Sequence, residues 1–196
     1  VLVKPNLLTA KEPEFAIDTH PQVVRAVIRV LKDLNCSVYL GDSPSVFGNQ
    51  SVDDVYERSG MAGVAQEEGI ALVKFDRRRW REKFPLTTWL DDCDYLVSGP
   101  KFKTHEFTIL TGAIKNLFGL VSGTYKTELH KNYFEPTEFA KILVDIYQQA
   151  KPALTIIDGI LAMEGDGPAT AGKTRRLNLL LGGSDCVALD TVMAKI

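Results

Sequence analysis

The stretch "DYLVSGPKFKTHEF", residues 94–107, contains an apolar run that ends abruptly in basic side chains. "DYLVSG" is typical of a buried strand, and Lys101, Lys103 and His105 follow it directly. These three residues alternate with others, so on an extended chain their side chains share one face. A strand that ends in this way predicts a binding site for an anion.

Similar apolar runs alternate with helical patterns along the rest of the chain. Strands are expected over "VLVKPN", "SVYLGDSP", "IALVKF", "ALTIIDG" and "RLNLLLGG". Helices are expected over "THPQVVRAVIRVLKDLN", residues 51–60 and 61–69, "FTILTGAIKNLFG", "EPTEFAKILVDIYQQAKP" and "DCVALDTVMAKI". This alternation predicts a three-layer α/β sandwich with a largely parallel, Rossmann-like sheet.

Residues 76–92, "DRRRWREKFPLTTWLDD", depart from this alternation because they are highly charged and contain Pro85. We expect a hairpin or an excursion from the main sheet here. An alternative is that the aromatic residues Trp80, Phe84 and Trp89 form an oligomer surface.

Composition narrows the class of protein. The chain has 196 residues, a net charge of −2, 45% hydrophobic and 24% charged residues, which predicts a single α/β domain over residues 1–196. The absence of a basic excess argues against a general nucleic-acid binder. No apolar run approaches the ~20 residues of a membrane span. Because "VLVKPN" starts without Met, we expect a piece of a longer protein, and the expected location is the cytoplasm.

The three cysteines, Cys36, Cys93 and Cys186, are far apart and form no CxxC pair. This spacing argues against a disulfide framework and against a cysteine-ligated metal site within this segment.

Polar residues follow nearly every predicted strand, at the edge where open α/β sheets bind ligands. The helix expected after Thr108 or Thr111 would add free N–H groups at its start. We therefore expect a phosphate or carboxylate to bind there. The predicted ligand-binding residues are Lys4, Asn6, Asp42, Ser43, Lys101, Lys115 and Asn116. An alternative is a solvated loop whose lysines pair with Asp91, Asp92 or Asp94.

His105 and Lys103 are the predicted catalytic residues. The ordinary pKa of histidine, ~6.5, suits a general acid or base, whereas the alternative for His105 is a hydrogen-bonding role. His130 is expected in an exposed polar loop, and His20 at the start of a helix.

The stretch "IIDGILAMEGDGP" concentrates carboxylates among turn residues. Asp158, Glu164 and Asp166 are the predicted ligands of a divalent cation, because hard cations prefer such oxygen atoms. The alternative is ordinary turn chemistry. No GxGxxG, Walker A or GxSxG motif is present.

Seven motifs occur in the order found in domain-of-unknown-function family 362, which the chain resembles over almost its whole length: "VKPNLL", "THP", "GDSP", "GPKFKTH", "TGAIKNLFGLVSG", "IIDGILAMEGDGP" and "GGSDCVALD". The resemblance implies a prokaryotic protein, and members are often named iron–sulfur proteins with a ferredoxin-like segment. Such a cluster would need cysteines from a segment outside this chain. The resemblance transfers no catalytic residue.

The leading hypothesis is an enzyme domain that binds a small anion and works with an iron–sulfur segment or a ferredoxin-like partner. The alternatives are a non-catalytic sensing or docking module of an electron-transfer protein, and a structural protein.

Overall fold

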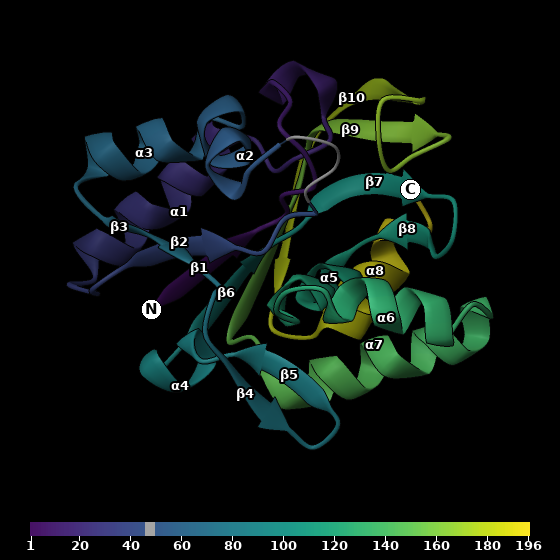
Figure 1. Cartoon of the computed structure of the whole chain (residues 1–196). Helices are drawn as coiled ribbons and strands as arrows, with labels where there is room; N and C mark the ends of the chain where they lie inside the picture. The colour runs from purple at the N-terminus through teal and green to yellow at the C-terminus, as the bar shows by residue number, and fades with distance from the viewer. Residues whose placement is uncertain (46–49) are drawn as a thin grey trace.

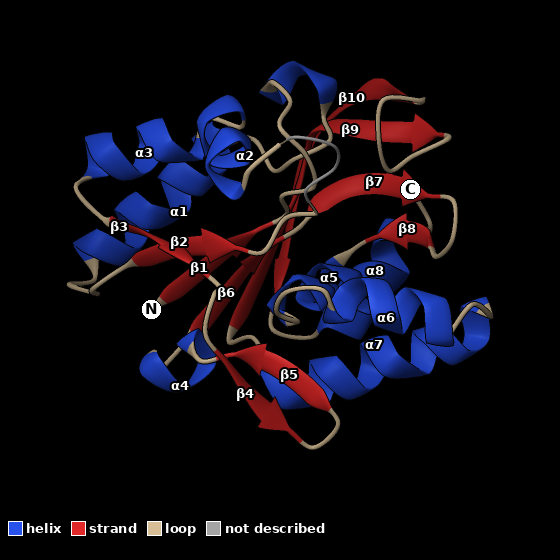
Figure 2. Ribbon diagram, in the orientation of Figure 1, coloured by secondary structure: helices blue, strands red, loops and turns tan. Residues whose placement is uncertain are grey.

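A largely parallel sheet forms the centre of the molecule (Figures 1 and 2). The computed structural model describes residues 1–45 and 50–196. The strands of the main sheet are β1 (Leu2–Pro5), β2 (Tyr39–Asp42), β3 (Ala71–Lys74), β6 (Leu96–Gly99), β7 (Lys101–His105), β8 (Ile109–Thr111), β9 (Leu154–Gly165) and β10 (Gly172–Gly183). Only β8 and β10 pair antiparallel to their neighbours among these strands of the described chain. The predicted three-layer α/β fold is confirmed.

The strand order reverses between β1 and β6. The parallel strands lie in the order β3-β2-β1-β6-β9, so the chain builds outward from β1 in one direction and then from β6 in the other. Lys4 pairs with Ser98 across this point. Open α/β sheets bind ligands beside such a reversal, at the carboxyl ends of the strands.

Strands β6 and β7 follow one another along β9, with an interruption at Pro100, which has no N–H to donate. β1 ends opposite Gly99, and β8 pairs with the following β7. Since β10 occupies the other side of β9 along nearly its whole length, β6 and β7 lie on the same side. The basic residues of β7 therefore lie beyond the end of β1.

Helices α1 (Pro21–Asp33), α2 (Val52–Arg58) and α3 (Met61–Glu68) cover one face of the sheet (Figure 1). Val24 and Ile28 of α1 pack with Leu40 of β2 and Val64 of α3 in one apolar cluster. The Nδ1 atom of His20 accepts a hydrogen bond from the Gln22 N–H at 3.2 Å, which caps α1 as predicted.

The second group of helices covers the other face: α5 (Ala113–Asn116), the 3₁₀ helix η2 (Leu117–Leu120), α6 (Tyr125–Asn132), α7 (Pro136–Ala150) and α8 (Cys186–Met193). Phe139 and Ile146 of α7 pack against Leu117 and Leu120 of η2. A further 3₁₀ helix, η1 (Pro13–Phe15), precedes α1. Within the described part of the chain, no helix has both the length and the apolar character needed to cross a bilayer.

The excursion predicted over residues 76–92 is confirmed as a hairpin of β4 (Arg78–Arg81) and β5 (Phe84–Thr87), followed by α4 (Trp89–Asp92). The proposed aromatic surface is not formed by all three side chains. Phe84 is 1% exposed, and Trp89 packs on Tyr39. Trp80 remains 53% exposed.

Two predicted elements differ in the structure. "FTILTGAIKNLFG" is not one helix but β8 followed by the single turn of α5, whose first N–H groups, of Ala113 and Ile114, donate to Asp190 at 2.5 and 3.0 Å. This helix start therefore offers no anion site. "IIDGILAMEGDGP" continues as a strand to Gly165, because β10 pairs with it along its length.

We expect Tyr56→Phe to lower the free energy of unfolding by about 1–3 kcal/mol. The buried Tyr56 hydroxyl accepts from the Asp42 N–H at 3.0 Å and lies 2.8 Å from the Asp42 and Val73 carbonyl oxygens, joining β2 to β3. Urea unfolding measures the change. Tyr95→Phe is the control because Tyr95 is 61% exposed. Equal stabilities of the two variants would contradict this role.

Candidate functional site

Lys4, at the carboxyl end of β1, is completely buried beside the reversal of strand order. Its Nζ lies 2.8 Å from Asp42 Oδ1 and donates to Asn116 Oδ1 at 3.1 Å and to the Pro5 carbonyl at 2.9 Å. Burial lowers the pKa of Lys4, and the charge of Asp42 partly opposes this shift. An ammonium group has three N–H donors, so all of them are used.

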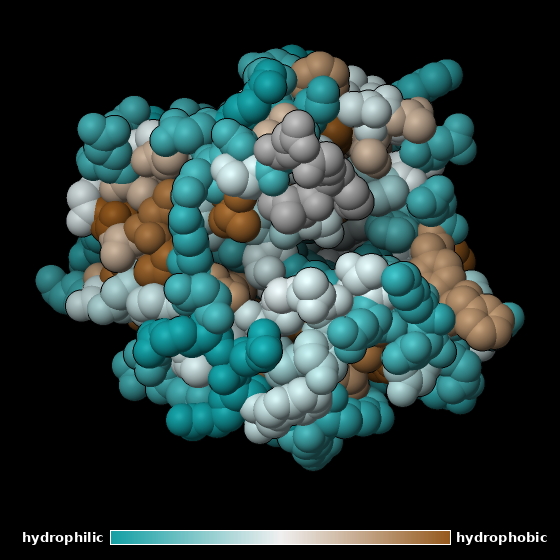
Figure 3. All heavy atoms as spheres, in the orientation of Figure 1, coloured by the Kyte–Doolittle hydropathy of each residue, from teal (hydrophilic) through white to brown (hydrophobic). Residues whose placement is uncertain are grey.

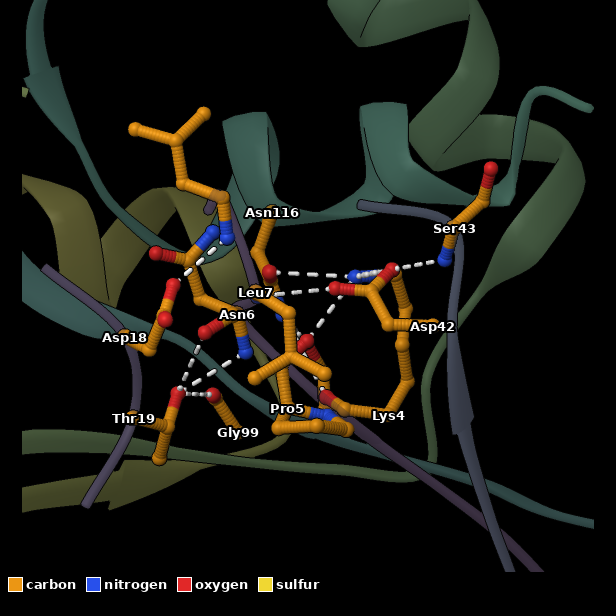
Figure 4. Close-up of polar contacts among 12 residues, drawn as sticks. Lys4, Pro5, Asn6, Leu7, Asp18, Thr19, Asp42, Ser43, Gly99 and Asn116 are labelled. Atoms are coloured by element: carbon orange, nitrogen blue, oxygen red, sulfur yellow. Dashed lines mark hydrogen bonds and ion pairs between the residues drawn. The ribbon is translucent and has the colours of Figure 1, made fainter. Parts of the chain in front are cut away.

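The side chains that bind Lys4 make further hydrogen bonds of their own (Figure 4). Asp42 also accepts from the N–H groups of Leu7 at 2.9 Å and Ser43 at 2.7 Å. The Asn116 side chain donates to Ser98 Oγ at 2.9 Å. We call Lys4, Asp42, Ser98 and Asn116 the locked network, because their polar groups bond to one another across β1, β2, β6 and α5. Lys4, Asp42 and Asn116, predicted to bind ligand, are brought together but form the base of the site.

Gly119 lies directly against this network. A Cβ atom at this position would come within 2.5 Å of Asp42 Oδ1 and 2.6 Å of Lys4 Nζ. Only glycine therefore allows η2 to approach the buried ion pair this closely.

Lys101 and Asp158 form a second buried pair, 2.7 Å apart, with both side chains fully inaccessible. Burial lowers the pKa of Lys101, and Asp158 partly restores it. Asp158 also accepts from the N–H groups of His20 at 2.8 Å and Ile160 at 3.2 Å, so it fixes the start of α1 beside β7.

The three carboxylates predicted to bind a cation are not brought together. Glu164 pairs with Arg175 at 2.9 Å near the exposed far end of β9, and Asp166 lies in the turn beyond it. Glu164 lies six positions after Asp158 along the strand, which is about 20 Å at ~3.3 Å per residue. No three metal-ligating side chains gather anywhere among residues 1–45 and 50–196. Binding of a divalent cation by this domain stays a prediction.

Lys103 and Asp18 are both buried, and their charges influence each other although these two described side chains form no direct ion pair. The Lys103 ammonium is 2% exposed and donates to the Ile17 carbonyl at 2.6 Å. Asp18 Oδ1 accepts from the Leu8 N–H at 2.5 Å. Burial raises the pKa of Asp18 to about 7 and lowers the pKa of Lys103 to about 7, and each charge partly opposes the shift of the other. Asp18 was not predicted from the sequence, because it lies in an irregular segment and not after a strand.

Two further lysines approach from the second group of helices. Lys115 Nζ lies 5.6 Å from the ring centre of Phe118 and 5.8 Å from that of Phe139, and it has no hydrogen-bond acceptor among the described residues. Lys126 of α6 donates to the Ser43 carbonyl. Burial lowers the pKa of both lysines to about 8. Lys126 was missed because α6 has almost no apolar periodicity, with Leu129 its one buried residue.

The two histidines of the site are held neutral. His105 Nδ1 accepts from the Phe107 N–H at 3.1 Å, so the proton of the neutral ring lies on Nε2. Burial lowers the pKa of His105 to about 3, with further contributions from Lys115, Lys103 and His130. His130 is exposed as predicted but lies on α6 and not in a loop; it stacks on Phe139 at 4.6 Å, and partial desolvation there lowers its pKa to about 4. This geometry favours a hydrogen-bond donor at His105.

Positive charge exceeds negative charge at this edge of the sheet. Five lysines influence one another's pKa values or interact with the same carboxylates, and only three carboxylates of the described chain lie among them. The lysines are Lys4, Lys101, Lys103, Lys115 and Lys126, and the carboxylates are Asp18, Asp42 and Asp158. The surface is hollowed near the centre of the face in Figure 3, between the two groups of helices. We call the five lysines and the three aspartates together the lysine cluster.

Comparisons with known proteins agree with this fold. The lactate racemase apoprotein from Thermoanaerobacterium thermosaccharolyticum superposes with a TM-score of 0.58 at 14% identity, over 96% of this chain and 47% of that one, which shows the fold alone. The thylakoid-associated protein sll1697 of Synechocystis sp. is 35% identical over 203 residues, and the match spans the whole of this chain but 62% of that relative. The model of the domain of unknown function DUF362 matches residues 1–195. The chain therefore belongs to the DUF362 family.

Proposed function

We propose that this domain binds a small anion, a phosphate or a carboxylate, at the lysine cluster and serves as the substrate-binding part of an enzyme. The number of lysines carries the proposal: three buried and two half-buried ammonium groups gather around only three carboxylates in the part of the chain that the structure describes. Burying an ion without a counter-charge costs several kcal/mol, so an anionic ligand would stabilise this arrangement.

The lysines divide into two groups by their hydrogen bonds. Lys4 uses all its donors within the locked network. Lys101, Lys103 and Lys126 each have one acceptor within the part of the chain that the structure describes, and Lys115 has none there. These four lysines therefore have N–H donors left for an anion.

The pair of Lys103 and Asp18 supports proton transfer. Because both pKa values lie at about 7, either side chain can hold the proton at neutral pH. The neutral His105 would donate a hydrogen bond to an oxygen atom on which negative charge develops. Lys103 would thus move the proton, and His105 would orient the substrate.

A redox form of this activity would need an iron–sulfur cluster whose cysteine ligands come from outside this chain. Cys36 and Cys93 are half-buried, Cys186 is buried, and the three form no metal-ligating group within the described residues. These cysteines do not fit an iron–sulfur cluster.

A second candidate is a non-catalytic sensing or docking module that uses the same anion site. The lowered pKa of His105 favours this candidate, since a module needs no titrating histidine.

We expect Lys115→Met to weaken the binding of inorganic phosphate or acetate about 10- to 100-fold, because it removes one charge-assisted contact of about 1.5–3 kcal/mol. The methionine keeps an apolar stem beside Phe118 and Phe139. Isothermal titration calorimetry measures the affinity. Lys141→Met is the control, because Lys141 is 71% exposed and pairs with Glu138. Unchanged affinity in Lys115→Met would contradict the proposed site.

Without an anion, stability should rise between pH 7.5 and 9. Lys103, Lys115 and Lys126 have lowered pKa values of about 7, 8 and 8 against the ordinary 10.5, so in this window the unfolded chain holds protons that the folded chain lacks. Each such lysine adds roughly 1 kcal/mol per pH unit. Urea unfolding measures the slope, which Lys115→Met should reduce. A flat or falling stability would show that these lysines stay charged in the fold.

We expect His105 to remain the neutral Nε2–H tautomer from pH 5 to 8, because burial and the neighbouring lysines lower its pKa to about 3. Nitrogen-15 NMR of histidine-labelled protein distinguishes the tautomers, and His105→Gln identifies the resonance. A titration midpoint near the ordinary ~6.5 would instead support His105 as a general acid or base.

A further inference from the structure

Two buried oxygen atoms, one next to the lysine cluster and one within it, have no hydrogen-bond partner among residues 1–45 and 50–196. They are Asn6 Oδ1 and Asp18 Oδ2. Asp18 as a whole is only 3% exposed. A buried acceptor without a donor costs about 1–3 kcal/mol, and such atoms in native proteins usually contact a water or a ligand.

The surrounding backbone fixes both residues. The Asn6 N–H donates to Thr19 Oγ1 at 2.8 Å, and the Thr19 N–H donates to the Asn6 carbonyl at 2.9 Å. Thr19 Oγ1 also donates to the Gly99 carbonyl at 2.6 Å, which ties this segment to the end of β6. In Figure 4, Asn6 and Asp18 lie on the Thr19 side of the cluster, opposite Asp42. The unpartnered oxygens therefore belong to a fixed scaffold.

Both acceptors also lie close in the chain to residues that bind lysines of the cluster. Lys103 binds the carbonyl of Ile17, the residue before Asp18. Asn6 follows β1 directly after Pro5, whose carbonyl accepts from Lys4. One small molecule could therefore contact ammonium groups and these acceptors together.

The chemistry of the two sets of groups differs. The lysines donate hydrogen bonds and suit an anion, whereas Asn6 Oδ1 and, when Asp18 is ionised, Asp18 Oδ2 need a donor, which a simple phosphate dianion or carboxylate lacks. A ligand ammonium group would supply a donor, but it would meet the excess positive charge of the cluster. A hydroxyl group supplies a donor without adding charge.

We infer that the anion bound at the lysine cluster carries a hydroxyl group near its charged end, as in a hydroxy acid or a polyol phosphate, and that this hydroxyl donates to Asn6 or Asp18. The inference rests on the proposed function and names the ligand class of the same site. Both ligand types share an anionic group that meets the lysines and a hydroxyl that meets the acceptors.

Matched pairs of ligands test the inference by isothermal titration calorimetry on the intact chain. Glycolate is compared with acetate, and glycerol 3-phosphate with propyl phosphate. The hydroxylated member of the binding pair should bind at least about tenfold more tightly, the effect of one hydrogen bond to a buried acceptor. The pair that binds shows whether the charged group is a carboxylate or a phosphate.

Two variants assign the preference to the residues. Asn6→Leu removes one acceptor at similar volume and should keep the affinity for the ligand without hydroxyl, whereas Asp18→Asn removes the charge of the other acceptor. At least one variant should reduce the preference for the hydroxylated ligand severalfold. Asn6→Leu leaves the Asn6 backbone contacts with Thr19 available and keeps the test usable if Asp18→Asn fails to fold.

The possible failures are distinguishable. Equal affinities within a pair that binds would overturn the inference, since the acceptors would then contact water, but would leave the anion site intact. A preference kept in both variants would also overturn it. Binding of none of the four probes would overturn the proposed function itself.

Discussion

Burial of ammonium groups at the carboxyl ends of the strands is the constraint on which this structure depends. Lys4, Lys101 and Lys103 are each at most 2% exposed, and they come from strands β1 and β7 of one sheet. Water cannot solvate these charges, so the protein must supply carboxylates, lose protons or bind an anion. The structure supplies carboxylates for Lys4 and Lys101 and leaves the remaining lysines with lowered pKa values.

The two buried ion pairs explain several features of the surrounding chain. The pair of Lys4 and Asp42 requires glycine at position 119, where a side chain would collide with both partners. The pair of Lys101 and Asp158 holds the start of α1 against β7 through the His20 N–H. Because these charges are already satisfied, the site has a rigid base. The donors left for a ligand are those that Lys101, Lys103, Lys115 and Lys126 do not use within the protein.

Much of this arrangement could be predicted from sequence, because strand ends in a parallel sheet meet at one edge. The alternation of Lys101, Lys103 and His105 after an apolar run placed them on one strand, and the structure confirms that strand as β7. Residues that reach the site from segments without a strand end were harder to predict. Asp18 and Lys126 carry no strand-end signal, since one lies in an irregular segment and the other on a polar helix.

The failures also have physical causes. Periodicity could not show that Asp190, from α8, occupies the start of α5 and so removes the expected anion site there. Turn residues in "MEGDGP" suggested a loop at the binding edge, but pairing with β10 extends β9 and places Glu164 far from Asp158. Both outcomes depend on long-range contacts that local patterns do not encode.

Crystals grown with selenate, a phosphate-like dianion, would test the anion site most directly through anomalous scattering at the selenium edge. The account predicts a selenium peak within hydrogen-bonding reach of Lys103 or Lys115, absent in Lys103→Met crystals grown in the same way. Selenium found only at the molecular surface, or at the cluster in both proteins, would contradict it.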